Sequence, residues 1–212
     1  MAKPRRTQEE RSQQTQSALL NATLDCILEY GLKDTSTTLI AERARVSRGA
    51  LMHHYPSKSA LLQAALRHLL QEQTQSIREM ADAVERGDLD INTFIDLLWE
   101  IFSGRMFMVS LEFVTASRTD PELKNVLWPV AIEFNLALDE IWEQLAHDRG
   151  GDREERRIAF NATLCFMRGL ATQFIWRGDR DPEHFKKLLG YWKTALEDRF
   201  AMQGEKNIAS AS

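Results

Sequence analysis

The residues best equipped for chemistry lie in one short stretch of this chain, residues 37–58, with the sequence TTLIAERARVSRGALMHHYPSK. Hydroxyl, guanidinium, imidazole and ammonium groups are concentrated there, and each can donate hydrogen bonds to phosphate oxygens or base edges. Residues 1–70 hold 10 Lys and Arg against 6 Asp and Glu, whereas the remainder holds 17 against 25. The stretch therefore lies in a basic segment of +4, before an acidic remainder of −8, which favours nucleic-acid binding.

Two very short helices are expected to position these groups. Thr37 and Ser47 are predicted to be their hydroxyl N-caps. The apolar stripe that follows the caps consists of Leu39, Ile40, Ala44, Ala50, Leu51 and His54. Helices this short are unstable alone, so packing must hold them. A short exposed helix at a sharp angle to its neighbour fits the major groove of DNA, and the stretch is predicted to be a helix-turn-helix.

This segment resembles the DNA-binding domain of the tetracycline repressor family. The resemblance covers residues 8–70, and it rests on Gly31, Thr35–Thr37, Ile40–Ala41, Val46–Gly49, His54–Tyr55 and Ser57–Lys58. Two positions depart from the family pattern, because Arg45 stands where glycine is common and Met52 where tyrosine is usual. The resemblance implies an N-terminal helix-turn-helix domain joined to a C-terminal helical domain that binds a ligand and dimerises.

The resemblance also implies the DNA contacts. Arg48 is expected to contact a guanine, because a guanidinium can pair with two acceptors on that base. Gly49 would let the backbone approach closely, and Ala50 would meet a thymine methyl group. The remaining contacts are expected to go to phosphate, from Thr37, Ser47, His53, His54 and Lys58. An N-terminal arm with Lys3, Arg5 and Arg6 would follow the backbone or minor groove, or is an ordinary charged tail.

Helical periodicity continues to the end of the chain, so the predicted fold is all-α with about nine helices. Residues 7–30 are expected to form the first long helix, capped by Gly31. Start signals at Asp120-Pro121 and Asp181-Pro182 open two later helices. The other predicted helices span 58–85, 91–103, 105–117 and 153–177. By function we divide the chain into residues 1–58, which bind DNA, a connecting helix at 59–85, a ligand-binding and dimerisation domain at 86–203, and a disordered tail at 204–212.

The second half is rich in aromatic and methionine side chains, which pack a core or, as the resemblance implies, line a pocket. The candidate ligand-binding residues are Trp99, Phe102, Met106, Phe113, Trp128, Arg168 and Gln173. The polar residues Ser110, Glu112, Thr115 and Asn161 are alternatives, which either orient a ligand or are satisfied within the core or the dimer interface. An apolar or amphipathic effector is favoured, and a strongly anionic one is disfavoured by the acidic balance unless Arg105, Arg118 or Arg168 points inward.

The helix at 153–177 is apolar around most of its circumference, so it must be covered on more than one side. A second copy of the chain is the simplest cover, and the resemblance agrees because family members dimerise through their last two helices. The expected interface residues are Phe166, Gly169, Phe174 and Ile175.

No catalytic constellation, nucleotide-binding loop or metal-ligand spacing occurs in the sequence, so we expect no enzyme activity, metal or cofactor. Cys26 and Cys165 are predicted to be buried reduced thiols. The chain carries no apolar run of transmembrane length and begins without a secretory h-region, so a cytoplasmic protein with no membrane partner is expected. The sequence predicts a homodimeric, ligand-responsive regulator, most simply a repressor, that binds a palindromic operator. The alternatives are a helical enzyme or carrier with a relic DNA-binding fold, and a DNA binder without a ligand.

Overall fold

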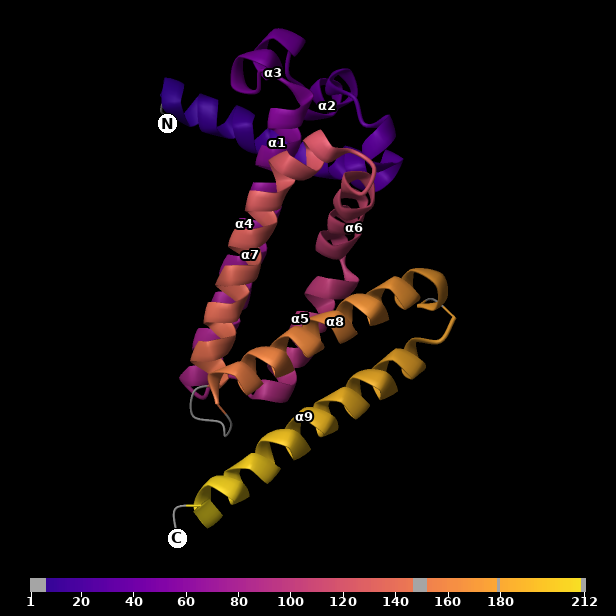
Figure 1. The fold of residues 1–212 in the computed structure, drawn as a ribbon. Helices are drawn as coiled ribbons and strands as arrows, with labels where there is room; N and C mark the ends of the chain where they lie inside the picture. Colours follow the sequence, from indigo (N-terminus) through magenta and orange to yellow (C-terminus); the bar gives the residue numbers. More distant parts are fainter. Residues whose placement is uncertain (1–6, 147–151, 179, 211–212) are drawn as a thin grey trace, which may run out of the picture. The chain divides into compact units, whose positions relative to one another are not determined.

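The computed structural model describes residues 7–146, 152–178 and 180–210, with side chains described as far as Arg199. That part of the chain is all-α and contains no strand (Figure 1). The helices are α1 Gln8–Asp34, α2 Thr37–Ala44, α3 Arg48–His54, α4 Lys58–Glu85, α5 Ile91–Ser103, α6 Arg105–Ser117, α7 Pro121–Ala146, α8 Arg153–Arg177 and α9 Pro182–Ser210. The predicted fold class is confirmed. The predicted basic arm at Lys3, Arg5 and Arg6 lies outside the described residues.

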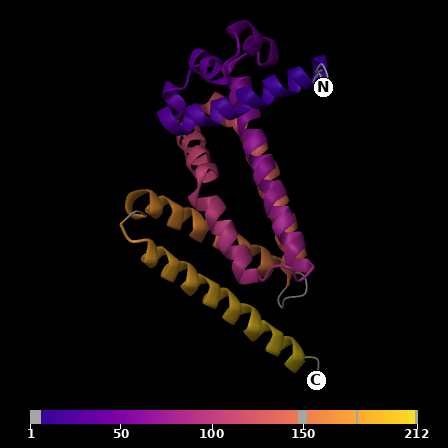
Figure 2. The ribbon, with the colours of Figure 1, turned by 180° about the vertical axis from the view of Figure 1, so that it is seen from behind.

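The helices form two compact units, each of which combines separate segments of chain. The first unit contains the residues up to Glu72 together with Met108–Ile132, and the second contains Gln73–Phe107 and the residues from Glu133 onward. Helices α4, α6 and α7 each begin in one unit and end in the other. Figure 2 shows the ribbon of Figure 1 from behind. The units therefore differ from the boundaries expected at residues 58 and 85, and the functional division remains a prediction.

Local start signals determine most helix bounds. The amide of Leu123 donates to Asp120 Oδ1 at 2.9 Å, and the amide of His184 donates to Asp181 Oδ1 at 3.3 Å. These N-caps open α7 and α9 as predicted, because the side-chain oxygen satisfies an amide that has no intrahelical partner. The expectation of a disordered tail at residues 204–212 needs a correction. The helix continues to Ser210, so residues 204–210 are helical and not a disordered tail.

Helix α1 begins with a capping box, in which Thr7 and Glu10 each accept a hydrogen bond from the other's amide. Gly31 interrupts its helical geometry with φ 75° and ψ 165°, and a last turn continues to Asp34. Positive φ is inexpensive for glycine because it lacks Cβ. Gly31 thus interrupts α1 but, contrary to the prediction, is not its C-cap, because the helix continues to Asp34 and Thr35 is the C-cap.

The second unit is held by apolar and aromatic contacts. Phe102, Leu98 and Met167 are at most 2% exposed. The rings of Trp142 and Phe160 stack with centroids 4.9 Å apart, and Trp142 Nε1 donates to the carbonyl of Arg156 at 2.9 Å. Since the indole N–H has an acceptor, this ring lies in the core without leaving a buried donor unpaired.

Candidate nucleic-acid interface and effector site

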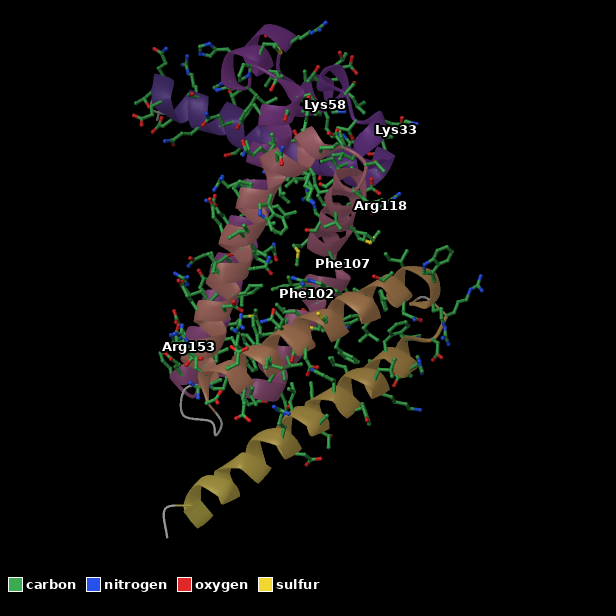
Figure 3. The ribbon with its side chains drawn as sticks, viewed as in Figure 1. Lys33, Lys58, Phe102, Phe107, Arg118 and Arg153 are labelled. Atoms are coloured by element: carbon green, nitrogen blue, oxygen red, sulfur yellow. The ribbon has the colours of Figure 1, made fainter. Side chains whose placement is uncertain are left out.

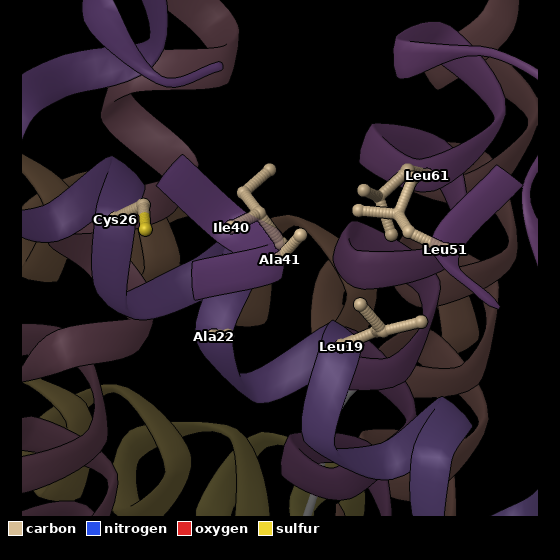
Figure 4. Packing of buried hydrophobic residues seen from close by; sticks show 7 residues of the cluster. All are labelled: Leu19, Ala22, Cys26, Ile40, Ala41, Leu51 and Leu61. Carbon is tan, nitrogen blue, oxygen red and sulfur yellow. The ribbon is translucent and has the colours of Figure 1, made fainter. Parts of the chain in front are cut away.

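The helix-turn-helix rests on a small core shared by α1, α2, α3 and α4. This cluster contains Leu19, Ala22, Cys26, Ile40, Ala41, Leu51 and Leu61, each at most 4% exposed (Figure 4). Helix α3 contributes only Leu51 as a buried residue. Leu51 therefore anchors this seven-residue helix, and Arg48, Gly49, Met52 and His53 remain exposed.

The caps on either side of the turn differ in one respect from the sequence prediction. Ser36, not Thr37, is the N-cap of α2, because the amide of Leu39 donates to Ser36 Oγ at 3.2 Å. Thr37 is the first residue of that helix, where its own amide is still free of an intrahelical partner. Ser47 caps α3 as predicted, since the amide of Ala50 donates to its hydroxyl oxygen at 3.1 Å.

Arg45 occupies the left-handed position of the turn. Its φ is 56° and its ψ is 40°, and its amide donates to the carbonyl of Glu42 at 3.1 Å. The amide of Val46 donates to the carbonyl of Ala41 at 3.0 Å. This is the geometry in which glycine is usual at the end of a helix. An arginine therefore bears a left-handed conformation, as its alignment with the family's glycine predicted.

Half of the eight predicted DNA-contacting residues are exposed, at the start and on the outer face of α3. Arg48, Gly49 and His53 are exposed on α3, as is Ser47 before it. Thr37, Ala50 and His54 are half-buried, and the rings of His53 and His54 meet edge to face at 5.5 Å. Met52 is 44% exposed. The structure thus gathers these residues around the start and outer face of one short helix.

Arg43 of α2 is held by contacts within the protein. Arg43 donates to Glu29 of α1 and to the Tyr30 hydroxyl at 3.4 Å, and its guanidinium lies over the Tyr30 ring at 5.6 Å. Hydrogen bonds from Tyr30 and Arg43 lower the pKa of the Glu29 carboxyl. Arg43 therefore ties α2 to α1, which leaves Arg45 and Arg48 as the exposed arginines of the turn and recognition helix.

Lys58, labelled in Figure 3, has a partner within the protein. Its Nζ donates to the carbonyl of Leu32 at 3.4 Å, and the side chain is half-buried. The backbone of Leu32 has a second partner, because its amide donates to Glu112 Oε2 of α6 at 3.0 Å. Leu32 is thus held by side chains from α4 and α6 at the turn that leads into the helix-turn-helix.

Glu112 was among the polar residues considered as ligand contacts, and the structure gives it this structural partner. A Cβ placed on Gly31 would come within 3.3 Å of Glu112 Oε2, so the carboxylate lies close against the backbone at the interruption of α1. No local sequence signal points to this contact, because 80 residues separate the two partners. Only the packing of α6 beside the end of α1 brings them together.

The predicted ligand-binding residues divide between the two units. Trp99, Phe102, Met106, Arg168 and Gln173 belong to the second unit, whereas Phe113 and Trp128 belong to the first. The side chain of Phe113 is buried, and that of Trp128 is 58% exposed, so Trp128 does not line an enclosed site in this structure. The second unit therefore holds the larger group of candidates.

A groove of about 420 Å³ lies between α8 and α9. It is lined by Cys165, Phe166, Gly169, Leu170, Gln173, His184, Phe185 and Leu188. Cys165 is exposed here, which corrects the prediction of a buried thiol, whereas Cys26 is buried, and burial raises the pKa of its thiol. Gln173 lies on this α9 side of α8 and is exposed.

The predicted dimer residues also fall into two groups. Phe166 stacks on Trp192 at 4.8 Å, and Phe174 meets Trp99 at 5.7 Å and Phe185 at 5.0 Å. Those two rings therefore have intramolecular partners. Gly169 faces open space, and Ile175 is 45% exposed. The surface of α8 and α9 further exposes Ile158 at 54%, Trp176 at 81% and Tyr191 at 73%.

Comparison with known proteins agrees with this architecture. Residues 19–65, which include the helix-turn-helix, match the family described as bacterial regulatory proteins, tetR family. The DNA-binding segment of this chain therefore matches the tetR family. The HTH-type transcriptional regulator CymR of Pseudomonas putida is 28% identical over 95% of this chain and 98% of its own length. This chain is thus a transcriptional regulator with a DNA-binding helix-turn-helix.

Solved structures show the same fold for nearly the whole chain. A transcriptional regulator from Rhodococcus sp. Rha1 superposes with a TM-score of 0.65 at 23% identity, covering 84% of this chain and 92% of that one. The multidrug binding protein EbrR, solved in complex with imidazole, superposes with a TM-score of 0.58 at 18% identity, covering 84% and 93%. Within the described residues of this chain, no helix is long and apolar enough to cross a membrane.

Proposed function

We propose that this tetR-family regulator is a homodimeric repressor that binds a palindromic operator and is released from it by a small molecule. The observation that carries the proposal is the exposed face of α3. This helix buries only Leu51, and it presents Arg48, Gly49 and His53 to solvent at the end of a basic segment. A short basic helix with a free outer face suits insertion into the major groove.

The proposed DNA contacts are of two kinds, those to base edges and those to phosphate oxygens. Arg48, Gly49 and Ala50 meet base edges, and Arg48 supplies the guanine contact. Phosphate oxygens are bound by Thr37, Ser47, His53, His54 and Lys58. An ammonium group has three donors, so Lys58 can reach a phosphate while it still donates to the carbonyl of Leu32.

A second copy of the chain is the proposed cover of the exposed surface of α8 and α9. Gly169 and Gly190 offer open space above their backbones, and Trp176 and Tyr191 expose large apolar surfaces nearby in sequence. Small residues permit close approach of helices, and exposed aromatic side chains on a soluble surface mark association sites. We propose Gly169 and Ile175 as direct contacts, with Phe166 and Phe174 supporting them from within the protomer.

The effector is proposed to bind in the second unit and to act through a continuous helix. Helix α6 begins in that unit and ends in the first, where Glu112 holds Leu32. An effector that prefers one position of α6 would change the separation of the two recognition helices, and a coupling of about 1–3 kcal/mol is sufficient for this purpose. The proposed setting is the bacterial cytoplasm, without a membrane partner.

Locating the operator tests the proposal. DNase I footprinting of the DNA beside the protein's own gene should reveal a two-fold symmetric protected site, and analytical ultracentrifugation should show a dimer in solution. An asymmetric site bound by a monomer would contradict the homodimeric mechanism. Protein that protects no sequence, yet turns over a small molecule, would support the alternative of a relic DNA-binding fold on a helical enzyme.

A further inference from the structure

Arg168 of α8 is a partly buried cation that contacts an amide and an aromatic ring. Its guanidinium lies over the ring of Phe102, 5.8 Å from the centroid, and its Nη2 donates to Asn135 Oδ1 at 3.5 Å. Burial lowers the pKa of Arg168, although a guanidinium stays protonated in any protein. The Arg168 side chain is half-buried, and its positive charge has a long hydrogen bond and an aromatic face as partners.

Other arginines of the same helix show the usual way of compensating such a charge. Arg156 has a side chain only 12% exposed and forms an ion pair with Glu143 at 2.5 Å, while the exposed Arg157 pairs with Glu154 at 2.8 Å. Among the described residues, no carboxylate forms an ion pair with Arg168. A desolvated charge without a counter-charge costs free energy, and an incoming anion removes that cost.

The surroundings of Arg168 indicate the polarity and the total charge of a ligand that would bind there. Phe102, labelled in Figure 3, is 2% exposed and belongs to α5, which packs against α8. The remainder of the chain after residue 70 carries a net charge of −8, so a ligand with several negative groups would be repelled. A single anionic group on an apolar body fits both conditions.

Resting on the proposed effector function, we propose that the effector is a small carboxylic acid with an apolar body, whose carboxylate is bound by Arg168 and whose body lies against Phe102. A guanidinium has five N–H donors in a planar fork, which matches the two oxygens of a carboxylate. The sequence alone favoured an apolar effector, and it admitted an anion only if an arginine pointed inward. The position of Arg168 over Phe102 meets that condition.

Matched pairs of probe molecules test whether binding requires the negative charge of the carboxylate. Octanoate and phenylacetate carry the carboxylate, while octanamide and phenylacetamide have the same size without it. Each is titrated into the full-length protein by isothermal titration calorimetry, and thermal unfolding is followed at saturating probe. At least one carboxylate should bind and raise Tm, since a ligand that prefers the native state stabilises it by mass action, and its amide should bind at least tenfold more weakly.

Three variants locate the contact. Arg168→Gln should weaken carboxylate binding by about ten- to a hundredfold, the effect of losing a charge-assisted hydrogen bond. Arg168→Lys should bind with intermediate affinity, because lysine keeps the charge but lacks the planar fork. Arg157→Gln, on the same helix, is the control and should bind as the native protein does. Equal affinity for acids and amides, no response to any acid, or equal weakening in Arg168→Gln and Arg157→Gln would overturn the inference.

A parallel measurement of operator affinity separates this inference from the proposed function. Amides that bind and release the operator as well as the acids do would leave the repressor mechanism intact and refute the anionic effector. Acids that bind through Arg168 and leave operator affinity unchanged would support the carboxylate site and refute effector-controlled release.

Discussion

The contact between Glu112 and Leu32 gives the sharpest test of how α6 supports the helix-turn-helix. Leu32 is 6% exposed, and its amide donates to Glu112 Oε2 at 3.0 Å. The substitution Glu112→Ala removes that acceptor and leaves a partly buried N–H unpaired. Such a loss costs about 1–3 kcal/mol, so the free energy of unfolding should fall by about that amount. Glu112→Gln keeps a carbonyl oxygen in reach, and its cost should be smaller.

The assay is urea unfolding followed by circular dichroism, at one fixed protomer concentration because dimerisation makes stability concentration-dependent. Glu140→Ala provides the matched control, since Glu140 is an exposed carboxylate in the middle of α7. That control should change stability by no more than about 0.5 kcal/mol. If Glu112→Ala is no more destabilising than Glu140→Ala, the hydrogen bond contributes nothing and Glu112 has no role in holding the end of α1.

Further substitutions test the remaining assignments. Arg48→Ala should lose about 1–3 kcal/mol of discrimination between operator and random DNA in fluorescence anisotropy, and equal losses on both would restrict Arg48 to phosphate. Lys58→Ala should weaken binding to all sequences and reduce the salt slope by about one unit, whereas an unchanged slope would leave Lys58 as a purely structural partner of Leu32. Arg45→Gly should raise the free energy of unfolding by about 1 kcal/mol, because glycine adopts φ 56° without the Cβ penalty; a lower stability would refute that strain. Ile175→Asp should yield folded monomers in ultracentrifugation, because a buried unpaired charge is costly, and an intact dimer would place the interface elsewhere.

The bounds of most helices follow from the sequence because their signals are local. Asp120 and Asp181 precede prolines and cap α7 and α9, and Ser47 caps α3. Each cap depends on a side chain and an amide only a few residues apart, so tertiary packing is not needed to identify it. The choice of Thr37 over Ser36 failed because two adjacent hydroxyl residues compete, and backbone geometry decides between them.

Periodicity and spacing also determined the all-α class and the helix-turn-helix, and the family resemblance pointed to the left-handed turn at Arg45, because each of these signals is local in the sequence. The tertiary structure alone decided which distant residues meet. It paired Glu112 with the backbone of Leu32, turned Phe174 toward Trp99 and Phe185, and placed Arg168 over Phe102 without a counter-charge. A helical pattern specifies which face is apolar, but the neighbour that covers that face depends on how all the helices pack at once.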